Sequence, residues 1–179
     1  MKLFRKLKKL VGVKELPNNN LKIEVTDKHD KKAVQTCEKI AWENNVKNGG
    51  TLYFTGIVAN WSNFLITCKK DKKIVGYISL TKNYMKKGDL YVGQIAVKKD
   101  FQGQGIGTAM YNYLIHHSKG YTEISAHVNE DNIVSQKTLK NAGFTEYQVA
   151  PDKRFYALDT QKIKDNAELQ ITVKNELIR

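Results

Sequence analysis

The chain has 179 residues, a length that suits one domain with a substantial hydrophobic core and leaves little room for a second. Hydrophobic residues make up 41% of the sequence, and no unbroken apolar run approaches the ~18 residues of a membrane span, so the composition excludes a transmembrane segment. The formal net charge of +12 suits a nucleic-acid partner, but five of the cations lie within residues 1–12 and the surplus is partly local.

Residues 1–20 are predicted to form a basic N-terminal segment and a linker. Apolar side chains recur at helical spacing through 1–12 with cations between them, which is typical of a short amphipathic helix. Such a helix can lie on an anionic membrane, contact RNA or pack on the domain, and packing on the domain is the interpretation we favour. Because lysines interrupt the apolar residues, we expect no secretory signal. Pro17 and the asparagines that follow it indicate a loop.

From residue 21 onward, segments with strand and helix patterns follow one another. Predicted strands cover 21–25, 63–71, 72–80, 90–97, 121–128, 144–149 and 153–159. Predicted helices cover 29–47, the stretch from the glycine-rich segment to about 118, and 132–142. A hairpin turn should join the second and third strands near 70–73, and Gly143 should close the last helix as a left-handed cap that returns Phe144 to the core. We assign one domain to 21–160 and leave 161–179 as a tail without assigned structure.

The two cysteines, Cys37 and Cys68, are far apart and form no CxxC or metal-binding spacing. We therefore expect free thiols that serve as buried packing residues, and a reducing cytoplasm as the compartment. The sequence predicts no metal site.

Residues 101–110 read FQGQGIGTAM and place Gly103, Gly105 and Gly107 between a predicted strand and a predicted helix. A backbone without side chains lets successive amides point into one concavity, and the helix adds its own unpaired amides and the positive end of its dipole. This combination binds phosphate. No lysine precedes Thr108, which excludes a P-loop, and the alternating glycines do not match the dinucleotide G-x-G-x-x-G. A diphosphate ligand at the strand end is the best physical interpretation.

The same residues resemble a known family. Residues 102–107, QGQGIG, match the Q/R-x-x-G-x-G/A motif of the GNAT N-acetyltransferase superfamily and follow a strand ending in IAV, as in that family. Asn132, Ser135, Gly143 and Phe144 match the pattern of the family's next helix at the expected spacing. The resemblance covers about 21–160.

The resemblance implies an α/β fold with a mixed, mostly antiparallel central sheet flanked by helices. The fourth and fifth strands, here 90–97 and 121–128, would splay apart to admit acetyl-CoA. Amides from Gln104 to Thr108 would hold its pyrophosphate, and the backbone of the fourth strand and the Asn132 side chain would bind its pantetheine arm. The residues implied in cofactor binding are Ile95, Ala96, Val97, Gln102, Gly103, Gln104, Gly105, Ile106, Gly107, Thr108, Asn132 and Ser135.

Acetyl transfer to an amine needs a proton acceptor, a donor to the thioester oxygen and, in some members, an acid for the leaving thiolate. His127 is the candidate base, because it lies five residues before Asn132, where some relatives carry a catalytic glutamate. Gln94 occupies a position that is often glutamate in relatives and could orient a water instead. A backbone amide near Ile95 or Ala96 is the candidate oxyanion donor.

Leu139 stands where many family members have a tyrosine that acts as the general acid. Tyr147 or Tyr156 could supply that acid instead, or the thiolate could leave unprotonated. The acceptor site is expected to involve 51–64, with its aromatic side chains, and 147–156.

The expected acceptor is a primary amine of a small molecule or of a protein. Two alternatives stay open: an aminoacyl-tRNA acetylating toxin of the same fold, and a CoA-binding module without catalytic activity. The sequence leaves the oligomeric state open, with a homodimer as one option. A peripheral membrane contact by residues 1–12 is a further option.

Overall fold

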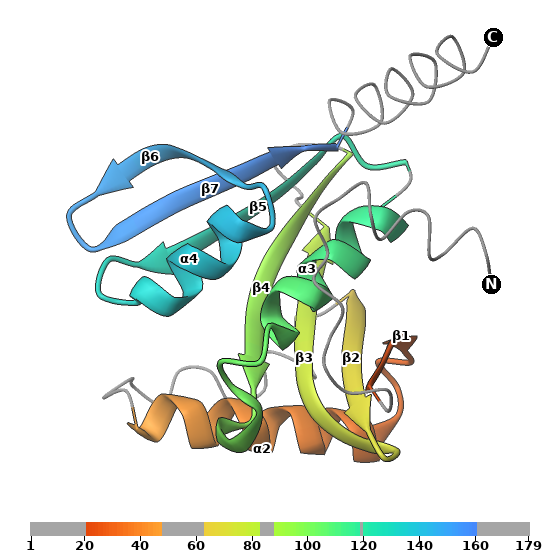
Figure 1. Cartoon of the computed structure of the whole chain (residues 1–179). Coiled ribbons are helices and arrows are strands. Elements are labelled where there is room, and N and C mark those ends of the chain that lie inside the picture. Colours follow the sequence, from red (N-terminus) through yellow and green to blue (C-terminus); the bar gives the residue numbers. More distant parts are fainter. Residues whose placement is uncertain (1–20, 48–62, 83–87, 119, 161–179) are drawn as a thin grey trace, which may run out of the picture. The chain divides into compact units, whose positions relative to one another are not determined.

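The computed structural model describes residues 21–47, 63–82, 88–118 and 120–160 (Figure 1). Its strands are β1 (Leu21–Thr26), β2 (Phe64–Lys70), β3 (Lys73–Lys82), β4 (Asp89–Val97), β5 (Glu123–Asn129), β6 (Thr145–Ala150) and β7 (Lys153–Asp159). Its helices are α2 (Lys31–Lys47), α3 (Ile106–His117) and α4 (Ile133–Asn141), with a short 3₁₀ turn, η3 (Lys99–Phe101). The predicted N-terminal segment, the tail from 161 and the aromatic residues of 51–62 lie outside the described residues.

Every predicted strand and helix within the described residues is present, and only the ends differ. The strand predicted at 121–128 begins at Glu123, and the helix predicted at 132–142 covers Ile133–Asn141, with Asn132 as its N-cap. The sheet order is β1-β2-β3-β4-β5-β7-β6, and the pairs β1–β2, β2–β3, β5–β7 and β6–β7 are antiparallel. The predicted mixed α/β fold with a mostly antiparallel sheet is confirmed, while the splay of β4 and β5 stays a prediction.

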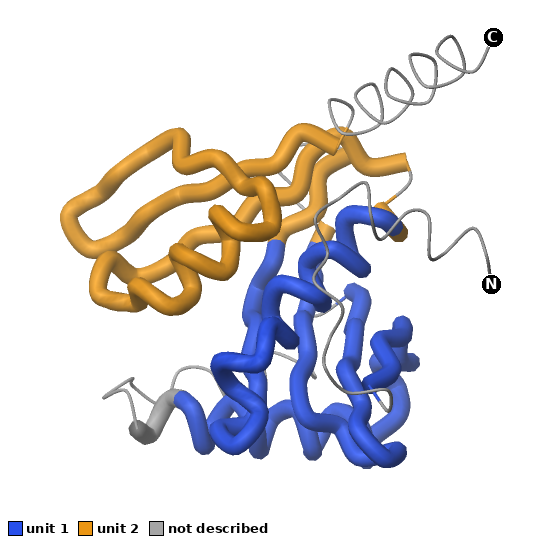
Figure 2. The backbone as a smooth tube through the Cα atoms, viewed as in Figure 1, with its two compact units in different colours: residues 1–81, 92–116 blue, residues 82–91, 117–179 orange. Residues whose placement is uncertain are grey.

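The chain divides into two compact units (Figure 2). Unit 1 comprises 1–81 and 92–116, and unit 2 comprises 82–91 and 117–179. The chain therefore passes from one unit to the other three times, and β4 begins in unit 2 and ends in unit 1.

The core of unit 1 forms where α2 packs on β2 and β3. Apolar residues of α2 recur at three- and four-residue spacing, which places one stripe of the helix against the sheet. The Asp30 carboxylate accepts the amides of Lys32 and Ala33, both at 3.1 Å, and so caps the start of this helix. The core cluster consists of Ala33, Val34, Cys37, Ile40, Ala41, Leu65, Ile74 and Tyr77.

Helix α3 packs on the sheet face opposite to α2. A methyl group added to Gly76 of β3 would lie 3.2 Å from the end of the Met110 side chain, so Met110 of α3 covers this position. The next residue along the strand, Tyr77, belongs to the α2 cluster, and successive strand residues point to opposite faces. The end of β4 is thus held between two helices.

A tight two-residue turn joins β2 to β3, as predicted. Asp71 and Lys72 have φ values of 49° and 66°, and Lys70 pairs with Lys73 across the turn. Positive φ at both central residues is the geometry that matches the right-handed twist of a hairpin.

In unit 2, α4 packs on strands β5 and β7 through buried apolar side chains. The buried apolar residues of this part of unit 2 include Ile124, Ala126, Leu139, Phe144, Tyr156 and Leu158. The predicted cap of α4 is confirmed, because Gly143 has a φ of 92°. The Gly143 amide donates to the Lys140 carbonyl at 3.0 Å, and the Phe144 amide donates to the Leu139 carbonyl at 3.1 Å.

Both cysteines are free and fully buried, which confirms their predicted role in packing. Burial raises the pKa of the Cys37 thiol to about 12 and that of Cys68 to about 11. Because the thiolate is the reactive form, neither side chain is a nucleophile at neutral pH.

Candidate active site

The predicted phosphate loop connects the end of β4 to α3. Gly103 and Gly105 have φ values of 71° and 77°, in the left-handed region that glycine adopts without strain. The side chain of Gln104 donates to the carbonyl of Asp100 at 3.0 Å, which closes the loop on the short turn η3. All residues from Gln102 to Gly105 are exposed. The loop therefore presents its backbone to solvent.

The third glycine does not belong to this loop. Gly107 lies within the first turn of α3, and it is not among the described glycines with positive φ. The sequence-based interpretation of three glycines in one loop was wrong on this point, because the helix begins at Ile106. Gly107 instead leaves the first turn of the helix without a side chain.

The amides at the start of α3 are the phosphate donors that the sequence predicts. The first bond within the helix runs from the Ala109 amide to the Gly105 carbonyl at 2.9 Å. The amides of Ile106, Gly107 and Thr108 therefore have no partner inside the helix. Together with the helix dipole, they suit a negatively charged group such as a pyrophosphate.

The Gln102 side chain fixes the loop to the rest of unit 1. Its amide nitrogen donates to the Val97 carbonyl at 2.9 Å and to the Asn44 side-chain oxygen at 2.7 Å. Asn44, on α2, in turn donates to the Val97 carbonyl at 3.2 Å and to the Ile40 carbonyl at 2.8 Å. The predicted contact of Gln102 with the cofactor stays a prediction, and its side chain holds the loop between β4 and α2.

The backbone of β4 has two edges with different partners. The Lys98 amide donates to the Val75 carbonyl of β3 at 2.8 Å, and the Ala96 carbonyl also faces β3, 3.2 Å from a methyl group added to Gly76. In an antiparallel pair, alternate residues direct their polar groups to opposite sides, so Ile95 and Val97 face away from β3. Of the two candidate oxyanion donors, the geometry favours the amide of Ile95 over that of Ala96.

Gln94 is held by a buried tyrosine. Its side-chain oxygen accepts a hydrogen bond of 2.6 Å from the hydroxyl of Tyr77, which is fully buried in the core of unit 1. Burial raises the pKa of this tyrosine, so the hydroxyl keeps its proton. The amide hydrogens of Gln94 can orient a water or a carbonyl, but an amide does not take up a proton at neutral pH.

His127, the predicted base, lies in unit 2 between two aromatic rings. The Tyr91 hydroxyl of β4 is hydrogen-bonded to Nδ1 of His127, and the two ring centroids are 5.5 Å apart. Phe155, the β7 residue opposite His127, packs on the imidazole with its ring centroid 5.9 Å from that of His127. Desolvation by these neighbours lowers the pKa of His127, and the charge of Lys153 lowers it further, although the side chain keeps an exposed part. The imidazole is therefore neutral at pH 7.

Asn132 and Ser135, the other predicted cofactor contacts, also belong to unit 2. The Asn132 side-chain oxygen accepts the Ser135 amide at 3.1 Å and caps α4. The Asn132 amide group keeps its two N–H donors, and both residues lie at the start of α4, where the helix dipole is positive. His127 precedes this helix by a few residues on β5. The predicted site residues therefore fall into two sets, one in each unit.

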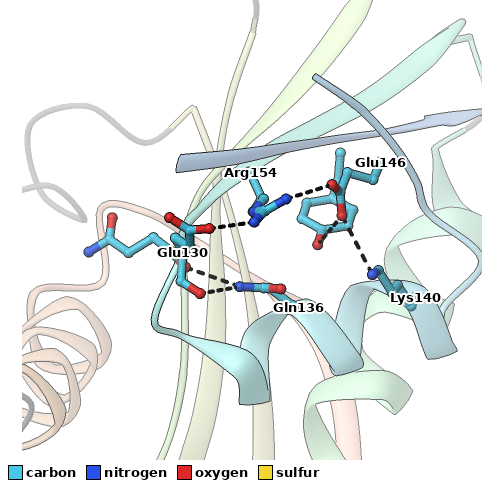
Figure 3. Close-up of polar contacts among 7 residues, drawn as sticks. Glu130, Gln136, Lys140, Glu146 and Arg154 are labelled. Carbon is cyan, nitrogen blue, oxygen red and sulfur yellow. Dashed lines mark hydrogen bonds and ion pairs between the residues drawn. The ribbon is translucent and has the colours of Figure 1, made fainter. Parts of the chain in front are cut away.

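The two tyrosines that could replace the missing acid differ in their surroundings. Tyr156 is fully buried and donates to the Glu146 carboxylate at 3.1 Å, so its proton is already engaged. Glu146 also binds Arg154 at 3.3 Å and Lys140 at 3.5 Å (Figure 3). Tyr147 is 60% exposed and packs on Phe155. Leu139, at the family's usual acid position, is buried in the core.

Three residues of this site were missed at the sequence level: Asn44, Tyr77 and Tyr91. Each of them is hydrogen-bonded to a predicted site residue that lies far from it in the sequence. Only Asn44 gives a local signal, because asparagine is a poor residue within a helix.

Among the described residues, no group of three or more His, Cys, Asp or Glu side chains is arranged to hold a metal ion. None of the described helices is long and apolar enough to cross a membrane.

Solved structures share this fold at low sequence identity. A GNAT acetyltransferase from Staphylococcus aureus superposes with a TM-score of 0.65 at 16% identity, over 78% of this chain and 99% of that one. A protein from Salmonella typhimurium, solved with its cofactor acetyl-CoA, superposes with a TM-score of 0.60 at 18% identity, over 79% of this chain and 95% of that one. A mutant of a spermidine N-acetyltransferase from Vibrio cholerae superposes with a TM-score of 0.61 at 17% identity, over 81% of this chain and 96% of that one. At such identities the likeness shows the fold alone.

Sequence comparison extends the likeness from fold to family. No curated protein matches the chain. The family model described as "Acetyltransferase (GNAT) family" matches residues 32–144, a span that includes all but the first residue of α2, the glycine loop, β5 and α4. The order of these elements and the loop geometry agree with that match, and the chain belongs to the GNAT acetyltransferase family.

Proposed function

We propose that this protein transfers an acetyl group from acetyl-CoA to a primary amine of a small molecule or protein, by direct attack of the amine in a ternary complex. The observation that carries the proposal is the tethered loop of unit 1. Gln102 and Asn44 hold it so that the first-turn amides of α3 remain available to a diphosphate. Acetyl-CoA supplies a thioester-activated acetyl group.

The residues that would hold acetyl-CoA follow from these donors. The amides of Ile106, Gly107 and Thr108, with the exposed loop before them, suit the pyrophosphate. The edge of β4 that faces away from β3 suits the amide groups of the pantetheine arm, and the Ile95 amide on this edge is the donor for the acetyl oxygen. The free N–H groups of Asn132 would add a further contact.

His127 would take the proton of the acceptor. An aliphatic amine is mostly protonated at neutral pH, with a pKa near ~10, and it must lose a proton before or during attack. A neutral imidazole on an exposed strand position can accept that proton directly or through a water. The lowered pKa of His127 keeps it neutral over the physiological range. The hydrogen-bonded amide of Gln94 would orient a water or the acceptor.

Turnover of acetyl-CoA tests the proposal. Thiol release should be measured against a panel of small amines, peptides with free N-termini and aminoacylated tRNA, with acetyl-CoA binding followed separately by calorimetry. We expect release that depends on a small amine or a peptide. Release only with aminoacylated tRNA would replace this proposal by the toxin alternative. Tight binding of acetyl-CoA without release on any acceptor would favour a binding module.

A further inference from the structure

Tyr91 and His127 form the best-defined polar pair near the proposed base. Tyr91 is half-buried on β4, and its hydroxyl is hydrogen-bonded to Nδ1 of the His127 ring. The two ring planes are tilted by 34°, and Phe155 flanks the imidazole on the neighbouring strand with a tilt of 48°. The same hydroxyl lies 3.4 Å from Nε2, so Nδ1 is the nearer of the two ring nitrogens and Nε2 is the one left for proton transfer.

The hydrogen bond can be made in two ways, and only one of them leaves a base. If the Tyr91 hydroxyl donates to Nδ1, the ring hydrogen lies on Nε2, which then has no lone pair to accept a proton. If Nδ1–H donates to the Tyr91 oxygen, Nε2 carries the lone pair. The second arrangement also persists after His127 becomes charged, because an imidazolium donates from both nitrogens and a phenol oxygen still accepts.

We propose that Tyr91 is a positioning residue that holds His127 in the tautomer with its hydrogen on Nδ1, so that Nε2 is the atom that accepts the proton of the amine. The inference rests on the proposed function, in which His127 is the base. It extends that function by assigning a role to Tyr91 and a direction to the imidazole. Tyr91 thereby acts through His127 and not on the acceptor.

The proton balance of the step is then defined at each atom. The neutral amine nitrogen forms a bond to the acetyl carbon as one of its protons moves to Nε2, directly or through a water; the extra proton of the ammonium form has left to solvent beforehand. The carbon–sulfur bond breaks, and its electron pair leaves with the sulfur as thiolate. Nδ1–H continues to donate to the Tyr91 oxygen, which stabilises the imidazolium until Nε2 returns its proton to the thiolate or to solvent.

Charged groups on each neighbouring element bear on this pair. Lys153, at the start of β7, lowers the pKa of His127, and Asp152, in the turn before it, opposes that effect. Burial raises the pKa of Tyr91 to about 12, and Tyr147 of β6 adds to the rise. The Tyr91 hydroxyl is therefore uncharged wherever the imidazole titrates, so the hydrogen bond stays neutral on the tyrosine side.

Nitrogen-15 NMR of the histidine rings tests the tautomer without any substrate. In the full-length protein at a pH where His127 is neutral, we expect its hydrogen on Nδ1, with the signal assigned by its loss in His127→Gln. Tyr91→Phe keeps the ring and removes only the hydroxyl, so the Nδ1–H preference should be lost. Tyr113→Phe, the same change on α3 in unit 1, should leave the tautomer unchanged. An Nε2–H tautomer in the wild type would overturn the proposal, whatever the variants do.

Kinetics separate this proposal from the proposed function. Tyr91→Phe should lower kcat by roughly 10-fold, which is the size of effect seen when a residue that hydrogen-bonds to a metal-binding histidine is removed. It should also move the acidic limb of the pH profile to lower pH, because the lost acceptor had favoured the charged imidazole. A reduced kcat with an unmoved limb would make Tyr91 merely structural and overturn its role. An Nδ1–H tautomer in a protein without any transferase activity would reject the proposed function and leave the geometry of the pair intact.

Discussion

At the scale of single residues, the site is defined by side chains whose partners limit what they can do. The Gln94 oxygen is taken by Tyr77, the Gln102 nitrogen by Val97 and Asn44, and one His127 nitrogen by Tyr91. A residue type alone allows several roles, and the partner selects among them. Of the two predicted catalytic side chains, only His127 can accept a proton, because the Gln94 amide is not a base at neutral pH.

The charge state of His127 leads to a prediction for the pH dependence of the reaction. Desolvation, and then the Lys153 charge, lower its pKa, so the neutral, proton-accepting form persists below the ordinary histidine value of ~6.5. The His127-dependent loss of kcat/KM on acidification should therefore begin below ~6.5. His127→Ala should remove that limb and lower kcat by ~10²-fold or more. Steady-state rates from pH 5 to 9 provide the measurement.

His29→Ala is the matched control, since this histidine is exposed and its backbone amide, which the substitution keeps, donates to Asp27. It should keep the wild-type profile. Near-normal kcat in His127→Ala between pH 6 and 9 would remove His127 from the mechanism and leave a water relay in its place.

At the scale of elements, the loop between β4 and α3 depends on its tether. Gln102→Ala removes two hydrogen bonds and frees the loop from β4 and α2. We expect the KM for acetyl-CoA to rise by roughly 10-fold, equivalent to about 1.4 kcal/mol, with a smaller change in kcat. Asn44→Ala should raise KM similarly, because it removes the same contact from the other side.

A double-mutant cycle separates this contact from general destabilisation. If Gln102 and Asn44 act as a unit, the double variant should weaken acetyl-CoA binding by less than the product of the two single effects. Multiplicative effects, with equal losses in thermal stability, would show that the two side chains contribute independently.

The elements themselves were predictable from the sequence, because their signals are local. Apolar spacing marked α2, and Asn132, Gly143 and Phe144 marked the ends of α4. The glycines marked the loop, although not the first residue of α3: Gly107 fits a loop and a first helical turn equally well. The partners of Asn44, Tyr77 and Tyr91 could not be found in this way, because they lie 58, 17 and 36 residues away in the sequence. Such pairs form only when the sheet assembles.

At the scale of the whole molecule, stability in acid should depend on the polar network of unit 2 (Figure 3). Hydrogen bonds from Tyr156 and Arg154 and the charge of Lys140 lower the pKa of Glu146. A lowered folded pKa contributes stability that is fully present above the ordinary carboxyl value of ~4.3 and is lost as pH falls through the folded value. Glu146→Gln should therefore be less stable than wild type at pH 7, and the difference should shrink towards pH 3.

Urea unfolding at both pH values measures this difference. Glu43→Gln, at an exposed position of α2, is the control and should keep the wild-type dependence on pH. An equal loss at pH 7 and pH 3 in Glu146→Gln would show that the packing of the side chain matters and that its charge does not.

The three passages of the chain between the two units have a consequence for recombination. Because 82–91 belongs to unit 2 and 92–116 to unit 1, neither unit is inherited as one uninterrupted gene segment. A chimera with a single crossover would join part of one unit to a foreign partner wherever the crossover lies. Exchange of unit 2, with His127 and Tyr91 together, requires that β4 be replaced up to residue 91 as well. Replacement of unit 2 as a whole therefore needs three crossovers, at 81/82, 91/92 and 116/117.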